Sequence, residues 1–321
     1  EAVYRMAKSL GLPVAFFVNK MDRDRADADA CVADIRASFG VRPVPLQIPL
    51  GSEGSFEGLV SLFQRKALIY AKDGSGTYEK RDLTGAMVDQ VDAVWENLVE
   101  TVAETNEDLL EKYLDTFTLS PEEIRTGFHD AMRSGEIVPV LFGAANQCVG
   151  ALALLELVSW AFPSPLERLG VSASSGSDPV EVVGAIDAPF VAQIIHTTVD
   201  ESSGKSSIFR VFSGAIPSDN LVDNSGREIS ERLGSLFSLR GRHRDQLSEA
   251  VTGDIMAVAK LKDSHTGDTL TTPKSGLVVE RVSYPSPMMS YSLHPVGKSD
   301  ADKIKVALDK TLDEDPTLSV G

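Results

Sequence analysis

Residues 13–22 have the sequence PVAFFVNKMD, in which an unbroken apolar run is followed by Asn19, Lys20 and Asp22. A continuous apolar run is typical of a strand that is buried on both faces of a parallel sheet. Ligands of such sheets bind outside the carboxyl ends of the strands, which is where these polar residues stand. The segment therefore predicts an α/β domain with a binding site at residues 19–22.

The segments around this strand continue the α/β pattern. Apolar residues at helical spacing predict helices, and short apolar runs bounded by Pro or Gly predict strands. The predicted helices are 2–10, 27–39, 87–104, 107–114, a helix beginning at 121, and 149–162. The predicted strands are 13–18, 44–48, 67–71 and 137–142. The change of pattern over about 50–136 indicates an α+β insertion between two parts of the α/β domain.

The helix that begins at Pro121 has the clearest start signal. Ser120 can cap the helix, Pro121 suits its first turn, and Glu123 completes an S-x-x-E capping box. This boundary is fixed by local chemistry alone, so we expect it to hold in the structure.

Later segments indicate further domains. A Ser- and Gly-rich stretch over 166–179 lacks periodicity and predicts a linker. From 180 to 275, short β-rich runs alternate with turn clusters, which is the rhythm of a small β-barrel. A strand at 288–293 and a helix at 300–312 predict the start of a third, α+β domain over 276–321.

The polar residues after the first strand suit a guanine base. An ionised carboxylate at Asp22 can accept hydrogen bonds from the ring N–H and the exocyclic amine of guanine, and adenine offers no such donor pair. Lys20 can lay its aliphatic stem along the purine. The alternative is an ordinary polar strand end, because a four-residue N-K-x-D occurs by chance in many proteins.

Composition limits the other functions. The chain has 47 acidic and 31 basic residues among 321, a net charge of −16, so its average field repels nucleic acid and any RNA contact must be local. The dense basic cluster Arg240, Arg242, His243 and Arg244 can contact RNA phosphates or form a solvated hairpin. Apolar runs are too short for a bilayer span, and the two cysteines form no CxxC pair, which indicates a cytoplasmic protein. The histidine spacing predicts no metal site.

Several motifs in one order resemble the elongation factor G family of translational GTPases. They are VNKMDR, PVPLQIPLG with a GLV turn at Gly58, VPVLFGAA, SIFRVFSGAI, residues 250–270, PSPMMSYSLHP and DEDPTLSV. The resemblance covers essentially the whole chain, and the wording SLRGRHRDQ is closer to a paralogue than to the housekeeping factor. It implies part of a P-loop GTPase-type α/β domain over 1–165, a β-barrel domain II over 180–275 and the beginning of a ferredoxin-like domain III.

The resemblance also implies the site residues. Asn19, Lys20 and Asp22 fall on the family's guanine motif, and Asn19 ties this turn to the phosphate loop when that loop is present. Gly143, Ala144 and Ala145 fall on the second guanine loop, usually Gly-Ser-Ala, whose backbone N–H meets the base oxygen. Because Ala144 replaces the serine, any support from a hydroxyl is lost. A tight strand-to-helix turn is the alternative for this loop.

For the full-length protein the resemblance implies GTP or GDP with Mg²⁺ as cofactors, and the ribosome, through its RNA and proteins, as partner of a monomer. The implied role is translocation of tRNA and mRNA or a related step. The 321 residues contain neither G-x-x-x-x-G-K-[ST] nor Asp-x-x-Gly-His. We therefore expect a catalytically silent fragment without bound nucleotide. The alternative function is a non-enzymatic module that binds RNA or protein and keeps a vestigial nucleotide domain.

Overall fold

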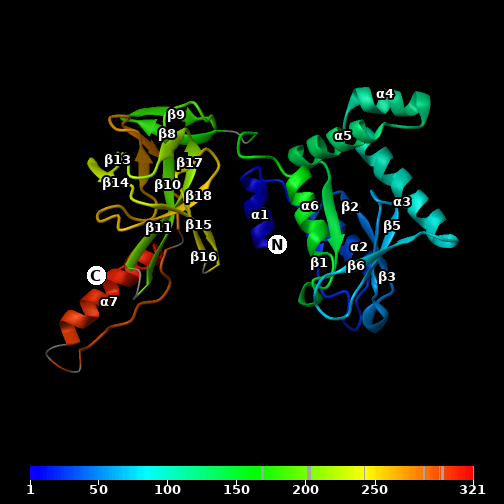
Figure 1. The fold of residues 1–321 in the computed structure, drawn as a ribbon, viewed down its shortest axis with the longest axis horizontal. Helices are drawn as coiled ribbons and strands as arrows, with labels where there is room; N and C mark the ends of the chain where they lie inside the picture. Colours follow the sequence, from blue (N-terminus) through cyan, green and yellow to red (C-terminus); the bar gives the residue numbers. More distant parts are fainter. Residues whose placement is uncertain are drawn as a thin grey trace. The chain divides into compact units, whose positions relative to one another are not determined.

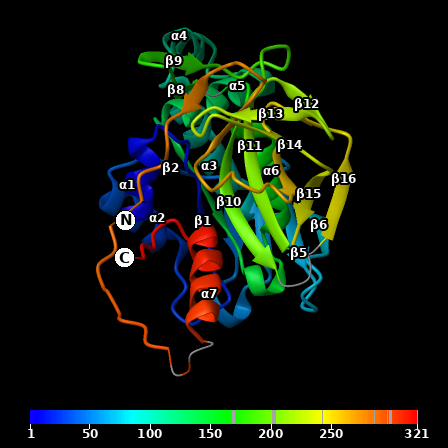
Figure 2. The same cartoon turned by 90° about the vertical axis from the view of Figure 1, so that its left-hand side faces the viewer.

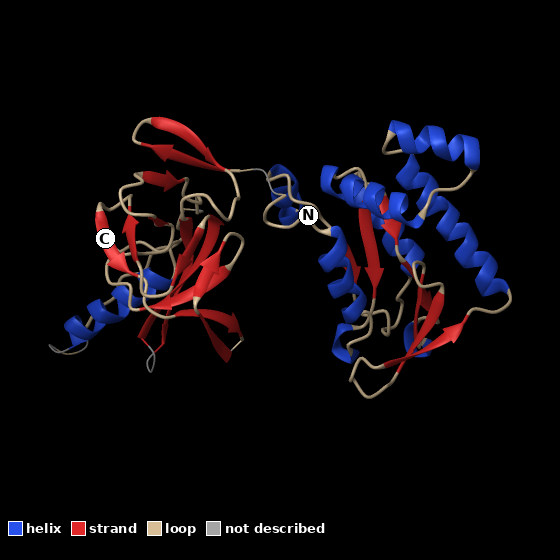
Figure 3. Ribbon diagram, turned by 45° about the horizontal axis from the view of Figure 1, so that its top comes forward, coloured by secondary structure: helices blue, strands red, loops and turns tan. Residues whose placement is uncertain are grey.

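The computed structural model describes residues 1–167, 170–200, 204–241, 243–284, 286–295, 297 and 300–320. The chain divides into two compact units, Glu1–Pro163 and Ser164–Gly321. In Figure 1 the first unit runs from blue to green and the second from green to red. Helices cover the sheets of the first unit, whereas strands dominate the second, as Figure 3 shows. This arrangement confirms a multidomain α/β chain with many strands.

A parallel sheet of three strands forms the centre of the first unit, in the order β1-β7-β2. The strands are β1 (Phe16–Val18), β7 (Val138–Phe142) and β2 (Pro43–Pro45). All five residues of β7 are buried, as the sequence predicts for a central strand with both faces covered. Phe16 pairs with Val140 and Val18 with Phe142, so β1 and β7 end at the same edge.

A second, antiparallel sheet of four strands follows in the order β3-β4-β5-β6. Its strands are β3 (Gln47–Leu50), β4 (Gly58–Ser61), β5 (Lys66–Tyr70) and β6 (Tyr78–Asp82). The predicted strand 44–48 is thus divided at Leu46 between two sheets. The predicted turn at Gly58 is wrong, because this residue begins β4 and pairs with Ile69. A Cβ at Gly58 would lie 2.0 Å from the Leu68 carbonyl oxygen, which explains the glycine.

Six helices of the first unit lie close to their predicted positions. They are α1 (Ala2–Ser9), α2 (Ala28–Phe39), α3 (Ala86–Ala103), α4 (Glu107–Thr116), α5 (Pro121–Ser134) and α6 (Ala151–Ala161). Gly40 ends α2 in the left-handed conformation. The capping box of α5 is confirmed, since Glu123 accepts from the Ser120 N–H and Ser120 accepts from the Glu123 N–H. Local signals therefore fix these helix ends.

One apolar core joins the insertion helices to the sheets of the first unit. Phe128 of α5 is fully buried and its ring centre lies 5.3 Å from that of Trp160. A second cluster surrounds the ends of β1 and β7, with Met21, Phe142 and Val149 buried. Both loops that follow these strands are therefore held by packing as well as by hydrogen bonds.

The second unit is built on an antiparallel sheet of eight strands, in the order β14-β13-β19-β10-β11-β18-β15-β16. They are β10 (Val191–Asp200), β11 (Gly204–Ser213), β13 (Leu221–Asn224), β14 (Ile229–Arg232), β15 (Leu236–Arg240), β16 (His243–Leu247), β18 (Ile255–Ala259) and β19 (Thr269–Thr271). Figure 2 shows β10 and β11 side by side. Their inward residues, among them Ile194 and Phe209, form its core. The predicted β-rich pattern is confirmed; closure into a barrel stays a prediction.

Shorter strands complete this unit. They are β12 (Ala215–Pro217), β17 (Glu249–Val251), β8 (Val171–Ser175), β9 (Asp178–Val182) and β20 (Leu277–Val279). The segment 166–179, predicted as a linker, contains β8 and the start of β9, which pair with each other. β8 also pairs with β20, which lies about a hundred residues further along the chain, so the prediction missed strands that this distant partner completes. The proposed domain limits at 165, 179 and 275 stay predictions.

The C-terminal helix α7 (Asp300–Glu314) confirms the predicted helix. Its end contacts the large sheet, because Glu314 accepts from the Val199 N–H at 2.6 Å and Asp313 pairs with Lys205. The predicted strand at 288–293 is not formed, since the described residues 286–295 have no strand pairing. A strand needs a neighbour that its own pattern does not supply.

Candidate guanine-binding site

Two loops meet at the carboxyl edge of the parallel sheet. The strand-end loop, residues 19–25, follows β1, and the second loop, residues 143–150, follows β7. The Met21 N–H donates to the Gly143 carbonyl at 3.0 Å, and the Gly143 N–H donates to the Val18 carbonyl at 3.0 Å. Met21 itself is buried and anchors the first loop in the core. The two segments expected to read a guanine therefore lie together, although more than 120 residues separate them.

Asn19 fastens one loop to the other. Its Oδ1 accepts from the Lys20 N–H and from the Ala145 N–H, both at 2.8 Å. Lys20 has a φ of 65°, a left-handed conformation that is costly for a residue with a Cβ. The bond from its own N–H helps to hold it there, and its side chain is exposed. Asn19 thus connects the strand-end loop to the second loop, whereas the resemblance assigns it a contact with the phosphate loop.

The backbone N–H groups of Gly143, Ala144 and Ala145 are already engaged. Ala145 donates to Asn19, Ala144 donates to the Val149 carbonyl at 3.1 Å, and Gly143 donates to Val18. The sequence assigns a backbone N–H of this loop to the base oxygen. In this structure each of these three N–H groups has a protein acceptor, so a base oxygen would share or displace one. Ala144 is buried and carries no side-chain donor.

Gly143 is required by close packing. A Cβ at this position would lie 2.3 Å from the Val149 carbonyl oxygen and 2.5 Å from a ring carbon of Phe17. Real Cβ atoms do not approach backbone so closely, so the turn from β7 into the second loop admits no side chain here. This contact explains the glycine at the start of the loop.

Asp22 has a side-chain partner that sequence reasoning missed. Its Oδ2 accepts from Gln147 Nε2 at 2.9 Å, and both side chains are half-buried. Gln147 lies in a 3₁₀ turn, η2 (Ala145–Gln147), of the second loop. A single glutamine 125 residues from Asp22 carries no local signal, so only the tertiary structure could reveal the pair.

The insertion also contacts both loops. Glu53, in the 3₁₀ turn η1 (Glu53–Ser55), donates its N–H to the Met21 carbonyl and accepts from the Arg25 N–H at 2.7 Å. Gly76, at the β5–β6 turn, lies against Cys148, since a Cβ there would be 2.9 Å from the Cys148 Cβ. The site therefore has three supports: the parallel sheet, the η1 turn and the β5–β6 hairpin.

Three residues of the predicted basic cluster, Arg240, His243 and Arg244, lie on the β15–β16 hairpin of the second unit. Arg240 faces His243 and Leu239 faces Arg244 across the hairpin, and all five residues of β16 are exposed. Arg240 pairs with Asp245 at 2.9 Å, which neutralises part of the cluster. Arg242 lies outside the described residues. The structure thus brings three of the four predicted basic residues together, on a solvated hairpin.

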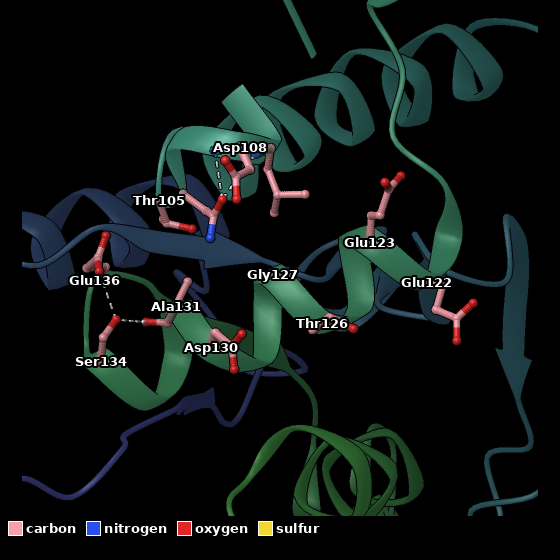
Figure 4. A pocket seen from close by; sticks show the side chains of 12 residues that line it. Thr105, Asp108, Glu122, Glu123, Thr126, Gly127, Asp130, Ala131, Ser134 and Glu136 are labelled. Carbon is pink, nitrogen blue, oxygen red and sulfur yellow. Dashed lines mark hydrogen bonds between the residues drawn. The ribbon is translucent and has the colours of Figure 1, made fainter. Parts of the chain in front are cut away.

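Two cavities of the first unit lie elsewhere. A groove of about 470 Å³ lies between α4 and α5. Figure 4 shows acidic side chains that line it and would repel phosphates: Asp108, Glu122, Glu123, Asp130 and Glu136. A second cavity, of about 420 Å³, is largely apolar and is lined by aromatic residues that include Phe63, Trp95 and Trp160. Neither includes a residue of the two loops. No group of three potential metal ligands occurs within the described ranges.

No helix in the described part of the chain has the length and hydropathy that a bilayer crossing requires.

Comparison with known proteins gives matches for both units. Residues 189–273 match the model for elongation factor G domain 2, and residues 284–321 match that for elongation factor G domain III. A protein from Thermus thermophilus, known from a crystal structure, matches over 100% of this chain, with 28% sequence identity and a TM-score of 0.83. The chain spans 45% of that protein. These matches show elongation factor G domains 2 and III in the second unit, and together they support a part of an elongation factor G family protein.

Proposed function

We propose that this chain is part of a ribosome-associated translational GTPase, in which the two loops recognise the guanine base of GTP or GDP. The matches to elongation factor G domains 2 and III support the translational role. The single observation that supports base recognition is the position of Asp22, held at the edge of the parallel sheet beside the second loop. Translocation or a related ribosomal step is the proposed process.

Each described site residue has a proposed role. The Asp22 carboxylate accepts the ring N–H and exocyclic amine of guanine, the Lys20 stem lies along the base, and Asn19 keeps the loops in register. Gly143, Ala144 and Ala145 form the wall of the site on the other loop. The chain contains no phosphate loop, so we assign phosphoryl transfer and Mg²⁺ binding to none of its residues.

The test is base selectivity. GDP and ADP carry the same phosphates and sugar, so the ratio of their dissociation constants isolates the base. Two hydrogen bonds to a charged acceptor contribute about 1.5 kcal/mol each at a half-exposed site, which predicts a roughly 100-fold preference for GDP. Titration of the isotope-labelled chain, followed by the backbone NMR signals of residues 19–22 and 143–147, measures both constants even when binding is weak.

Asp22→Ala is the matched variant. We expect it to lower the GDP affinity towards that of ADP while the circular dichroism spectrum stays the same. Equal affinity of the unaltered chain for GDP and ADP would contradict guanine recognition and favour a binding module without a nucleotide role. Retention of full GDP preference by the variant would contradict the role of this carboxylate.

A further inference from the structure

Gln147 stands apart among the residues around Asp22. Its Nε2 donates to Asp22 Oδ2 at 2.9 Å. Within the described part of the chain, no other side chain donates a hydrogen bond to this carboxylate. Ala144, on the same loop, is buried and has no polar side chain that could do so. The orientation of the Asp22 carboxylate is therefore set from the second loop by a single amide.

The backbone around Gln147 holds this amide in place. The Gln147 N–H donates to the Ala144 carbonyl at 2.9 Å, and the Cys148 N–H donates to the Ala145 carbonyl at 3.0 Å. Cys148 then turns the chain with a φ of 55°, and the Val149 N–H returns to the Ala144 carbonyl. Because backbone hydrogen bonds hold the turn at Gln147 and at the two residues after it, the position of the Gln147 Cα is fixed.

An ionised carboxylate has room for this bond and for a base. Its two oxygens offer about four lone-pair directions, so Oδ2 can accept from Gln147 and still accept from a guanine donor. A glutamine amide also fixes the rotation of the carboxylate plane before the base arrives. Ordering a side chain in advance removes part of the conformational cost of binding.

We propose that Gln147 is a positioning residue for guanine selectivity: it orients the Asp22 carboxylate so that both oxygens face the donors of the base. The proposal rests on the proposed function, since it assigns a residue to the same site. It gives the second loop a side-chain donor to Asp22, which Ala144 does not supply. If Gln147 instead competed with guanine for the Asp22 carboxylate, its removal would raise the affinity for GDP.

The experiment compares GDP, IDP and ADP on the 321-residue chain and on Gln147→Ala. IDP lacks the exocyclic amine, so it keeps one of the two donors to Asp22. We expect Gln147→Ala to weaken GDP binding about three- to tenfold, to weaken IDP binding less and to leave ADP binding unchanged. The GDP-to-IDP selectivity should therefore fall. Gln147→Glu, which places a like charge beside Asp22, should reduce GDP affinity further.

The exposed neighbour Asn146 provides the control, and Asn146→Ala should leave all three affinities unchanged. An unchanged GDP affinity and selectivity in Gln147→Ala would overturn the proposal, as would a gain in GDP affinity. An equal loss for all three nucleotides would show a merely structural role and would overturn it too. If the unaltered chain does not prefer GDP over ADP, the proposed function fails first, so the two failures are distinguishable.

Discussion

Removal of the Asp268 carboxylate should destabilise the second unit and leave the first unit unaffected. Asp268 is 1% exposed and accepts from Arg227 Nε at 2.5 Å, from Asn224 Nδ2 at 3.0 Å and from the His265 N–H at 2.9 Å; Arg281 also pairs with it. Burial alone would raise the pKa of Asp268, but these donors outweigh it and hold the pKa below 3.8. The carboxylate is thus ionised and fully occupied.

The magnitude follows from which donors lose a partner in Asp268→Ala. The side chains of Arg227 and Arg281 are 40% and 55% exposed, so water can replace most of their loss. The buried Asn224 amide and the His265 N–H cannot be compensated so readily, and each costs about 1–2 kcal/mol. We expect a total of about 3 kcal/mol. For a unit of this size that corresponds to a melting temperature lower by about 6–12 °C.

The two tryptophans make the assay specific, because Trp95 and Trp160 both lie in the first unit. Calorimetry should show the transition of the second unit move down while the midpoint of tryptophan fluorescence stays constant. The lowered pKa of Asp268 also predicts how the effect depends on pH. The stabilisation of the second unit by the Asp268 carboxylate is present above pH 3.8 and is lost as the pH falls through the lower, folded-state pKa. The difference between the two proteins should therefore narrow in acid. Equal melting temperatures at pH 7, or an equal shift of both units, would refute this reasoning.

Glu123→Gln should lower the fluorescence midpoint at neutral pH but not near pH 2, because hydrogen bonds from Lys112 and Ser120 lower the pKa of Glu123 from 4.5 to about 2. This stabilisation is present above pH 4.5 and is lost as the pH falls through about 2; an equal difference at both pH values would contradict the assignment. Arg244→Ala should weaken binding of the full protein to purified ribosomes, with the slope of log affinity against log salt smaller by about 0.9 if one phosphate contact is lost. Unchanged affinity and slope would remove the hairpin from the interface.

Local signals predicted the helices well. The cap at Ser120 and the glycine at Gly40 need only neighbouring residues, so the ends of α5 and α2 could be located from sequence. The strand 13–18 was predicted longer than β1, because pairing with β7 covers only its last three residues. Strand β6, with four charged residues among five, has no apolar alternation and is defined by its partner β5. Prediction of strands from sequence fails where the strand is defined by its pairing with another segment.

The sequence by itself located Asn19, Lys20 and Asp22 at the end of an apolar strand and predicted their chemistry, because residue type and position after such a strand are local properties. The order of several motifs also indicated elongation factor G domains, and the comparisons match two of them in the second unit. Only the tertiary structure decided that Asn19 binds the second loop and that Gln147 donates to Asp22. Contacts between segments more than a hundred residues apart depend on strand pairing and packing, and no periodicity within either segment encodes them.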